Sequence, residues 1–102
     1  MNKSKESVDI KTKNKIIDII SVLIPDAKIY LFGSRARNKY SQSSDIDIAI
    51  DAGKKLPIAD VDEIVSVFAA TNIMERIDVV DVHQVSEEMR DSIKEEGILW
   101  KS

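Results

Sequence analysis

Residues 45–51 have isoleucine at every second position with aspartate or alanine between, and this alternation restricts the fold of the 102-residue chain more than any other segment. Successive side chains of a β-strand point to opposite faces of the sheet. The three isoleucines would therefore face the protein interior, while Asp45 and Asp47 would share the other face. The segment predicts a half-buried strand that carries two carboxylates together.

Helical and strand patterns alternate along the rest of the chain. Apolar residues recur at helical spacing between Thr12, a candidate N-cap, and Pro25. Pro57 suits the first position of a second long helix, Ser86 suits the cap of a third, and Gly97 suits its C′ position. The predicted fold class is α/β (α+β type), in the order α-β-α-β-α-β-α. The expected strands are 28–32, 46–50, 77–82 and a short final one at 98–100. The second and third long helices are expected to end near residues 72 and 96. A helical turn is expected after residue 33.

Length and composition limit the number of domains. With 102 residues, of which 43% are hydrophobic and 32% charged, the chain can bury one core but not two. Residues 1–11 are polar and rich in lysine, which predicts a flexible lead-in. A single folded domain over 12–102 is expected.

Charge and cysteine content exclude several classes of function. Fifteen Lys and Arg against eighteen Asp and Glu give a formal net charge of −3, so no general basic field attracts nucleic acid. The chain has no cysteine, which excludes a disulfide scaffold, a thiolate zinc site and a cysteine nucleophile. It also has no apolar run long enough to span a bilayer and no apolar signal core at its start. A cytoplasmic location without membrane binding is expected.

A Gly-Ser pair, Gly33 and Ser34, precedes the acidic strand. Ten residues separate this pair from Asp45-Ile46-Asp47. A glycine lets the backbone approach a ligand, and amide groups at the start of a helical turn bind anions such as phosphate. Two carboxylates at i and i+2 on a strand lie roughly 7 Å apart at their Cα atoms, so their oxygens can converge on a hard cation such as Mg²⁺. The spacing predicts a site for a metal and a phosphate.

The third predicted strand offers a further carboxylate, from Asp78 or Asp81. These two residues face opposite sides of the strand, so only one of them can join Asp45 and Asp47. Three carboxylates would leave coordination positions open for substrate oxygens and water.

Three segments together, LFGSRAR, SDIDIAID and RIDVVD, resemble the polymerase-β-like nucleotidyltransferase superfamily, and specifically its minimal nucleotidyltransferase (MNT) proteins. The resemblance extends from about residue 12 to residue 100. It implies a short mixed β-sheet covered by helices, with residues 12–102 as one nucleotidyltransferase domain. Asn38 stands where such segments often have a second glycine, and asparagine tolerates a positive φ better than most residues. By resemblance, Asp78 is the preferred third carboxylate.

The resemblance also implies an activity: transfer of a nucleoside monophosphate, AMP from ATP, to a hydroxyl acceptor with release of pyrophosphate. The implied cofactor is Mg²⁺, two ions, with Mn²⁺ as a substitute. The implied partner is a helical HEPN toxin with a tyrosine acceptor, so that the chain acts as an antitoxin.

Two alternative functions stay open. The chain could be a non-catalytic subunit that neutralises or escorts a partner protein, or it could transfer the nucleotide to a small molecule; self-association is also open. The expected catalytic and metal-binding residues are Asp45, Asp47 and Asp78, and the expected nucleotide-binding residues are Gly33, Ser34, Arg35 and Arg37.

Other polar and aromatic residues are expected to have structural roles. Asp51 lies at the end of the acidic strand, where a turn role is favoured over a fourth metal ligand. His83, the only histidine, is expected at the surface, because a two-metal site can activate a hydroxyl without it. Tyr30, Tyr40 and Trp100 do not form a platform for stacking bases and are expected to pack.

Overall fold

The computed structural model describes residues 7–41 and 43–102, and these ranges form the helices and strands in the predicted order, with the short final strand at the end. All four strands begin where the sequence predicts, and their ends differ by at most one residue. No helix in the described ranges combines the length and apolarity needed to cross a membrane. The elements are α1 (Ile10–Leu23), β1 (Lys28–Phe32), α2 (Gly33–Ala36), β2 (Ile46–Asp51), α3 (Ile58–Ala69), β3 (Ile77–Asp81), α4 (Glu87–Glu96) and β4 (Ile98–Lys101).

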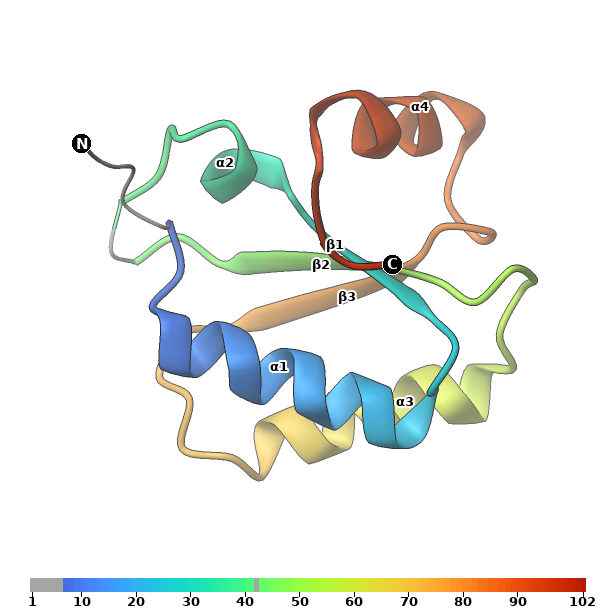
Figure 1. Ribbon diagram of the computed structural model, residues 1–102, viewed down its shortest axis with the longest axis horizontal. Coiled ribbons are helices and arrows are strands. Elements are labelled where there is room, and N and C mark those ends of the chain that lie inside the picture. The colour runs from blue at the N-terminus through green and yellow to red at the C-terminus, as the bar shows by residue number, and fades with distance from the viewer. Residues whose placement is uncertain (1–6, 42) are drawn as a thin grey trace.

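The strands form one mixed sheet in the order β3-β2-β1-β4 (Figure 1). β1 lies antiparallel to both of its neighbours, β2 and β4, whereas β2 and β3 run parallel. Parallel neighbours need a long crossover, and α3 supplies it. β3 is therefore an edge strand that has β2 as its one neighbour in the sheet.

Helices cover both faces of the sheet: α1 and α3 lie on one side, α2 and α4 on the other (Figure 1). The three isoleucines of β2 are fully buried in the main core, together with Ile16 from α1 and Ile64 from α3. Ala49 faces the opposite way and packs in a smaller cluster with Ile93 of α4. Asp47 shares the face of Ala49, so the acidic side of β2 points toward the α2 and α4 layer, as the alternation predicts.

The first helix begins earlier than the sequence predicted. Its N-cap is Asp9 and not Thr12, because the Asp9 carboxylate accepts a hydrogen bond from the Lys11 amide at 3.1 Å. Val8, directly before the cap, is 2% exposed and packs in the main core. Both aspartate and threonine are good caps, and the burial of Val8 selects the earlier one. Residues 1–6 of the predicted lead-in lie outside the described residues.

Three other predicted assignments at helix ends also change. Pro57 is the N-cap of α3 and not its first helical residue, and α3 ends before the predicted position. Ser86 caps α4 as predicted. Gly97 ends α4 in an extended conformation with φ −71°, so the predicted C′ role is wrong. A Cβ on Gly97 would overlap the carbonyl oxygen of Ile93, and this crowding explains why glycine is required there.

Candidate active site

The strand register brings the Gly-Ser turn and the carboxylates into one row across the sheet. Phe32, the last residue of β1, pairs with Asp47 of β2, and Asp47 pairs with Asp78 of β3. Directly paired residues project to the same face, so the carboxylates of Asp47 and Asp78 are neighbours. Gly33 follows Phe32 in the chain, and Asp45 lies two residues before Asp47. We call Gly33, Asp45, Asp47 and Asp78 the acidic row.

Gly33 turns the chain from β1 into α2 and leaves room for a carboxylate. Its φ is +75°, in the left-handed region that favours glycine. A Cβ built on Gly33 would overlap Oδ2 of Asp47. Ser34 follows half-buried in the first turn of α2. Asn38 has a φ of 61°, the conformation that its residue type was expected to tolerate.

The acidic row raises the pKa of Asp47 above its ordinary value of 3.8. The largest cause is burial, which disfavours the charged carboxylate. The negative charges of Asp78 and then of Asp45 raise the pKa further, while the positive charge of Arg37 opposes them. The row is therefore a place of concentrated negative charge that a cation would stabilise.

The donor chemistry of the row fits Mg²⁺, which prefers oxygen ligands and is usually held by one or two carboxylates together with water and substrate phosphates. Among residues 7–41 and 43–102, no three acidic or histidine side chains are gathered into a metal cage. Within the row, Oδ1 of Asp78 lies 3.3 Å from Nε of Arg76. The carboxylates fit a site that substrate oxygens complete.

Arg37 and a cleft beside α4 extend the Gly33 end of the row. The NH1 group of Arg37 lies 3.6 Å from Oε1 of Glu96, and the Arg37 side chain is 52% exposed. The cleft has a volume of about 480 Å³ and is lined by Phe32, Gly33, Arg37 and side chains of α4. Small-molecule sites have volumes of roughly 300–1,000 Å³. A nucleotide therefore has room next to the glycine turn.

Comparisons with known proteins agree with this geometry. Residues 8–102 match the family model described as polymerase beta, nucleotidyltransferase. This chain belongs to that nucleotidyltransferase family. A Haemophilus influenzae protein named probable protein adenylyltransferase MntA is 32% identical over 92 residues, which cover 90% of this chain and 75% of that protein.

Two solved toxin–antitoxin structures resemble this nucleotidyltransferase domain. A complex with AMP-PNP superimposes with a TM-score of 0.75 and 30% identity, covering 88% of this chain and 73% of the other. A complex of the tri-AMPylated Shewanella oneidensis HEPN toxin with its MNT antitoxin gives a TM-score of 0.70 and 29% identity, covering 90% of this chain and 71% of the other. The predicted resemblance to MNT proteins and the predicted fold class are both confirmed.

Arg35 was predicted to contact the nucleotide, but in the structure it is buried inside the nucleotidyltransferase domain. It is 5% exposed, and its guanidinium donates hydrogen bonds to the carbonyl of Ser44, at 3.2 and 2.9 Å, and to the carbonyl of Ser7, at 2.6 Å. The ring of Tyr40 lies 5.0 Å from the guanidinium. Because Ser44 directly precedes Asp45, Arg35 fixes the backbone from which the first carboxylate of the row projects.

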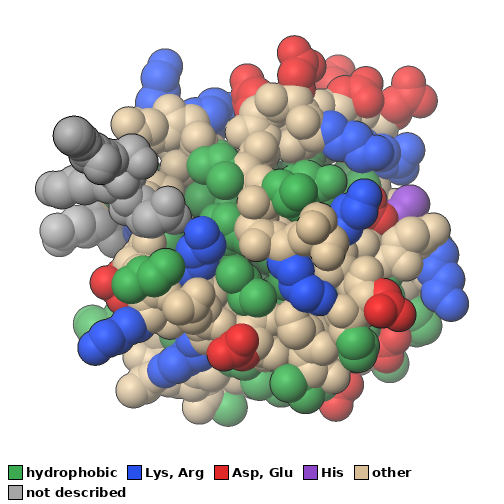
Figure 2. Space-filling model, viewed as in Figure 1, with side chains coloured by type: hydrophobic (Ala, Val, Ile, Leu, Met, Phe, Trp, Pro, Cys, Tyr) green, Lys and Arg blue, Asp and Glu red, His purple; other side chains and the backbone are tan. Residues whose placement is uncertain are grey.

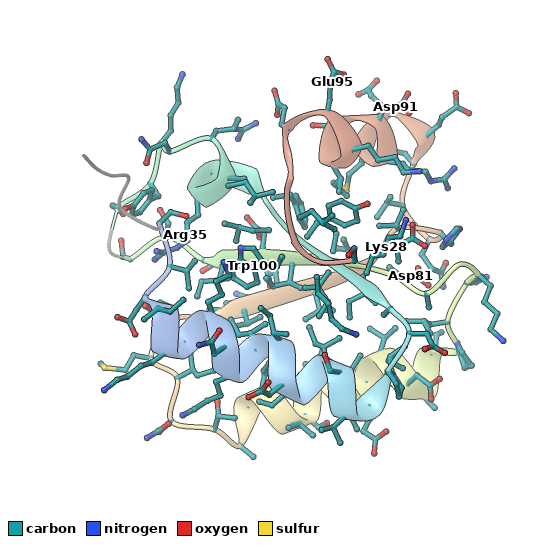
Figure 3. All side chains as sticks on the ribbon, in the orientation of Figure 1. Lys28, Arg35, Asp81, Asp91, Glu95 and Trp100 are labelled. Carbon is teal, nitrogen blue, oxygen red and sulfur yellow. The ribbon has the colours of Figure 1, made fainter. Side chains whose placement is uncertain are left out.

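Asp81, the other candidate for the third carboxylate, faces away from the acidic row. It is 4% exposed, and its oxygens accept hydrogen bonds from the amides of Leu56 at 2.7 Å and His83 at 2.9 Å. Figure 3 shows Asp81 and Arg35 at opposite ends of the sheet. This placement favours Asp78 as the third carboxylate and gives Asp81 the task of holding two loops together.

Asp51 and His83 form a second polar pair, at the end of β2 that is far from the row. Nε2 of His83 lies 2.8 Å from Oδ1 of Asp51, which also accepts the amide of Gly53 at 2.8 Å, as expected for a turn residue. Burial favours a higher pKa for Asp51, but the hydrogen bonds from Gly53 and His83 outweigh it and lower the pKa. The pair stabilises loops and contributes nothing to the row.

Sequence reasoning missed Arg76. It directly precedes β3 and stands two residues before Asp78, which along a strand places both side chains on one side. The interval of two residues between Arg76 and Asp78 was the sequence signal that could have predicted this contact.

Proposed function

We propose that this chain transfers AMP from ATP to a tyrosine hydroxyl of a HEPN-type partner protein and so acts as an antitoxin. The observation that carries the proposal is the acidic row, which sets a glycine turn beside two strand carboxylates and a cleft of nucleotide size. The relative named as a protein adenylyltransferase and the complex that contains an AMPylated HEPN toxin support the choice of AMP and of a protein acceptor.

Asp45, Asp47 and Asp78 would hold Mg²⁺ in this proposal, as two ions, with Mn²⁺ as a substitute. When bound, the metal neutralises triphosphate charge and lowers the pKa of the acceptor hydroxyl. The raised pKa of Asp47 supports this assignment, because the carboxylates repel one another without a cation.

Other residues of the chain bind and orient the nucleotide. The backbone at Gly33 and Ser34 approaches the phosphates, and Arg37 adds positive charge from the α2 side. Arg35 supports the site through Ser44. The acceptor oxygen then forms a bond to the α-phosphorus while the bond from that phosphorus to the bridging oxygen of the β-phosphate breaks. Pyrophosphate leaves, and the hydroxyl proton passes to water.

The test combines nucleotide binding with transfer. The chain is titrated with AMP-PNP in a calorimeter with and without Mg²⁺, and then incubated with Mg²⁺, ATP and a candidate HEPN-type partner protein. We expect Mg²⁺-dependent binding, and an adenylyl group on a tyrosine of the partner in its mass spectrum. Asp47→Asn serves as the inactive control. Tight binding of the partner with neither nucleotide binding nor transfer would instead support the non-catalytic subunit.

A further inference from the structure

Arg76 is anchored at the point where the two acidic strands begin. Its carbonyl oxygen accepts the amide of Ile46, the first residue of β2, at 2.8 Å. Ile46 lies between Asp45 and Asp47 in the chain. The backbone of Arg76 is therefore held in register with the strand that carries two of the three carboxylates, and its side chain starts from a fixed position.

The Arg76 side chain forms an ion pair that is easily exchanged. Its Nε lies 3.3 Å from Oδ1 of Asp78, and the two side chains are 76% and 42% exposed. Exposed ion pairs contribute only about 0.2–1 kcal/mol, so another ligand of Asp78 can displace the guanidinium. A divalent cation is the ligand that carboxylates in such a group favour.

A neighbouring cavity gives the displaced side chain a place to go. Arg76 lines a pocket of about 650 Å³ that also includes Tyr40, Asp45 and Met74. Met74 is 96% exposed, so this side of the row is open. The guanidinium can leave Asp78 by side-chain rotation alone, without breaking the backbone hydrogen bond to Ile46.

We propose that Arg76 is a counter-ion latch: it occupies Asp78 when no divalent cation is bound and is displaced when the cation enters the acidic row. The proposal rests on the proposed function, because it assumes that the row holds a metal. Arg76 acts as a positioning residue through Asp78 and weakens metal binding to the empty site. The row then fills most readily when a metal arrives together with a nucleotide, whose negative charge attracts the displaced guanidinium.

The test measures the affinity of the chain for Mn²⁺ by calorimetry without nucleotide, so that activity is not the readout. Parent, Arg76→Ala and Arg76→Lys are compared. Lys54→Ala is the matched control, because Lys54 is an exposed cation that follows β2. The strand from Asp47 to Asp51 alone spans about 13 Å, which exceeds the screening length of about 10 Å. Arg76→Ala should bind Mn²⁺ about 1.4- to fivefold more tightly, the range to which an exposed ion pair of this kind corresponds. Arg76→Lys should stay near the parent, and Lys54→Ala should equal it.

The outcomes distinguish a failure of the latch proposal from a failure of the proposed metal site. Asp78→Asn reports whether Asp78 contributes to binding at all and should weaken it. If Asp78→Asn binds more weakly while Arg76→Ala binds no more tightly than the parent, the latch is wrong and the metal site stands. If neither the parent nor Arg76→Ala binds Mn²⁺, with or without AMP-PNP, the metal site of the proposed function fails and the latch fails with it. Circular dichroism of each variant confirms that the comparison is made on folded protein.

Discussion

Asp47 is the residue at which structural and functional requirements conflict. It lies between two other carboxylates of the acidic row, against the glycine turn, and its pKa is raised by burial and by those two charges. An acid whose pKa is raised in the folded protein destabilises that protein when it ionises. The chain therefore keeps a charged side chain at a position where a neutral one would be more stable.

Replacing Asp47 should stabilise the metal-free chain in a pH-dependent way. Below the unfolded value of 3.8 the carboxyl is protonated in both states, and no penalty exists. As the pH rises through the folded pKa, the parent loses stability, whereas Asp47→Asn does not. We expect a higher melting temperature for Asp47→Asn at pH 7, with a difference that disappears near pH 3. A variant that is less stable than the parent at pH 7 would contradict this assignment of charge repulsion.

Gly33 and Gly53 allow the effect of the carboxylate contact to be separated from backbone strain. Both have positive φ, 75° and 80°, but a Cβ on Gly33 would overlap Asp47, whereas a Cβ on Gly53 would have nothing within 4 Å. Gly53→Ala should cost about 1–2 kcal/mol of unfolding free energy from the left-handed backbone alone. Gly33→Ala should cost about 1 kcal/mol more and should also lose AMP-PNP binding, because the row must shift. Denaturant unfolding measures both; equal losses would mean that the Asp47 contact is relieved without cost.

At the scale of the element, β3 uses its two faces for different purposes. Asp78 points to the acidic row and Asp81 to the loops before α3 and after β3. In the proposed function, one strand therefore carries both a metal-binding carboxylate and a structural one, three residues apart in the chain.

Substitution of these two aspartates should separate activity from stability. Asp81→Ala removes the acceptor of two backbone amides and should lower the unfolding free energy by about 1–3 kcal/mol, while the folded fraction stays active. Asp78→Asn should leave the unfolding free energy nearly unchanged and abolish transfer. Denaturant unfolding and the adenylylation assay are run on both variants. An inactive but stable Asp81→Ala would mean that the wrong face of β3 has been chosen.

The elements themselves were largely predictable from the sequence. The alternation in β2 gave its buried face, and the Gly-Ser spacing identified the turn before it. The exceptions depend on contacts between distant segments. The burial of Arg35 needs the carbonyl of Ser7, which is 28 positions away, and the early start of α1 needs the core to accept Val8. Local residue preferences cannot predict either contact. Arg35 was therefore expected to bind phosphate, because it follows the Gly-Ser pair.

At the scale of the whole molecule, charge is distributed unfavourably for a nucleotide. The chain has a net charge of −3, and acidic side chains gather over α4 (Figure 2), the helix that lines the cleft beside Gly33. A free triphosphate would meet like charge both there and at the acidic row. Binding should therefore depend on a divalent cation that arrives with it.

This dependence can be measured as thermal stabilisation. AMP-PNP alone should shift the melting temperature very little, and Mg²⁺ alone should shift it modestly. The two together, at about 100 times the dissociation constant, should add about 2.7 kcal/mol of stability, which is several degrees for a domain of this size. Asp47→Asn should lose the combined shift. Equal stabilisation by AMP-PNP with and without Mg²⁺ would contradict the role of the row.

The edge position of β3 has a consequence for local unfolding. Because β3 contacts only β2 in the sheet, it can detach while the antiparallel strands remain paired, as edge elements with few neighbours do. Detachment would carry Asp78 away from Asp45 and Asp47 and dismantle the site. Ligand that binds only the assembled site must then suppress this opening, in proportion to its occupancy. The backbone amides of Ile77–Asp81 should therefore exchange with solvent deuterium more slowly when the site is filled, so that this edge strand reports the occupancy of the site.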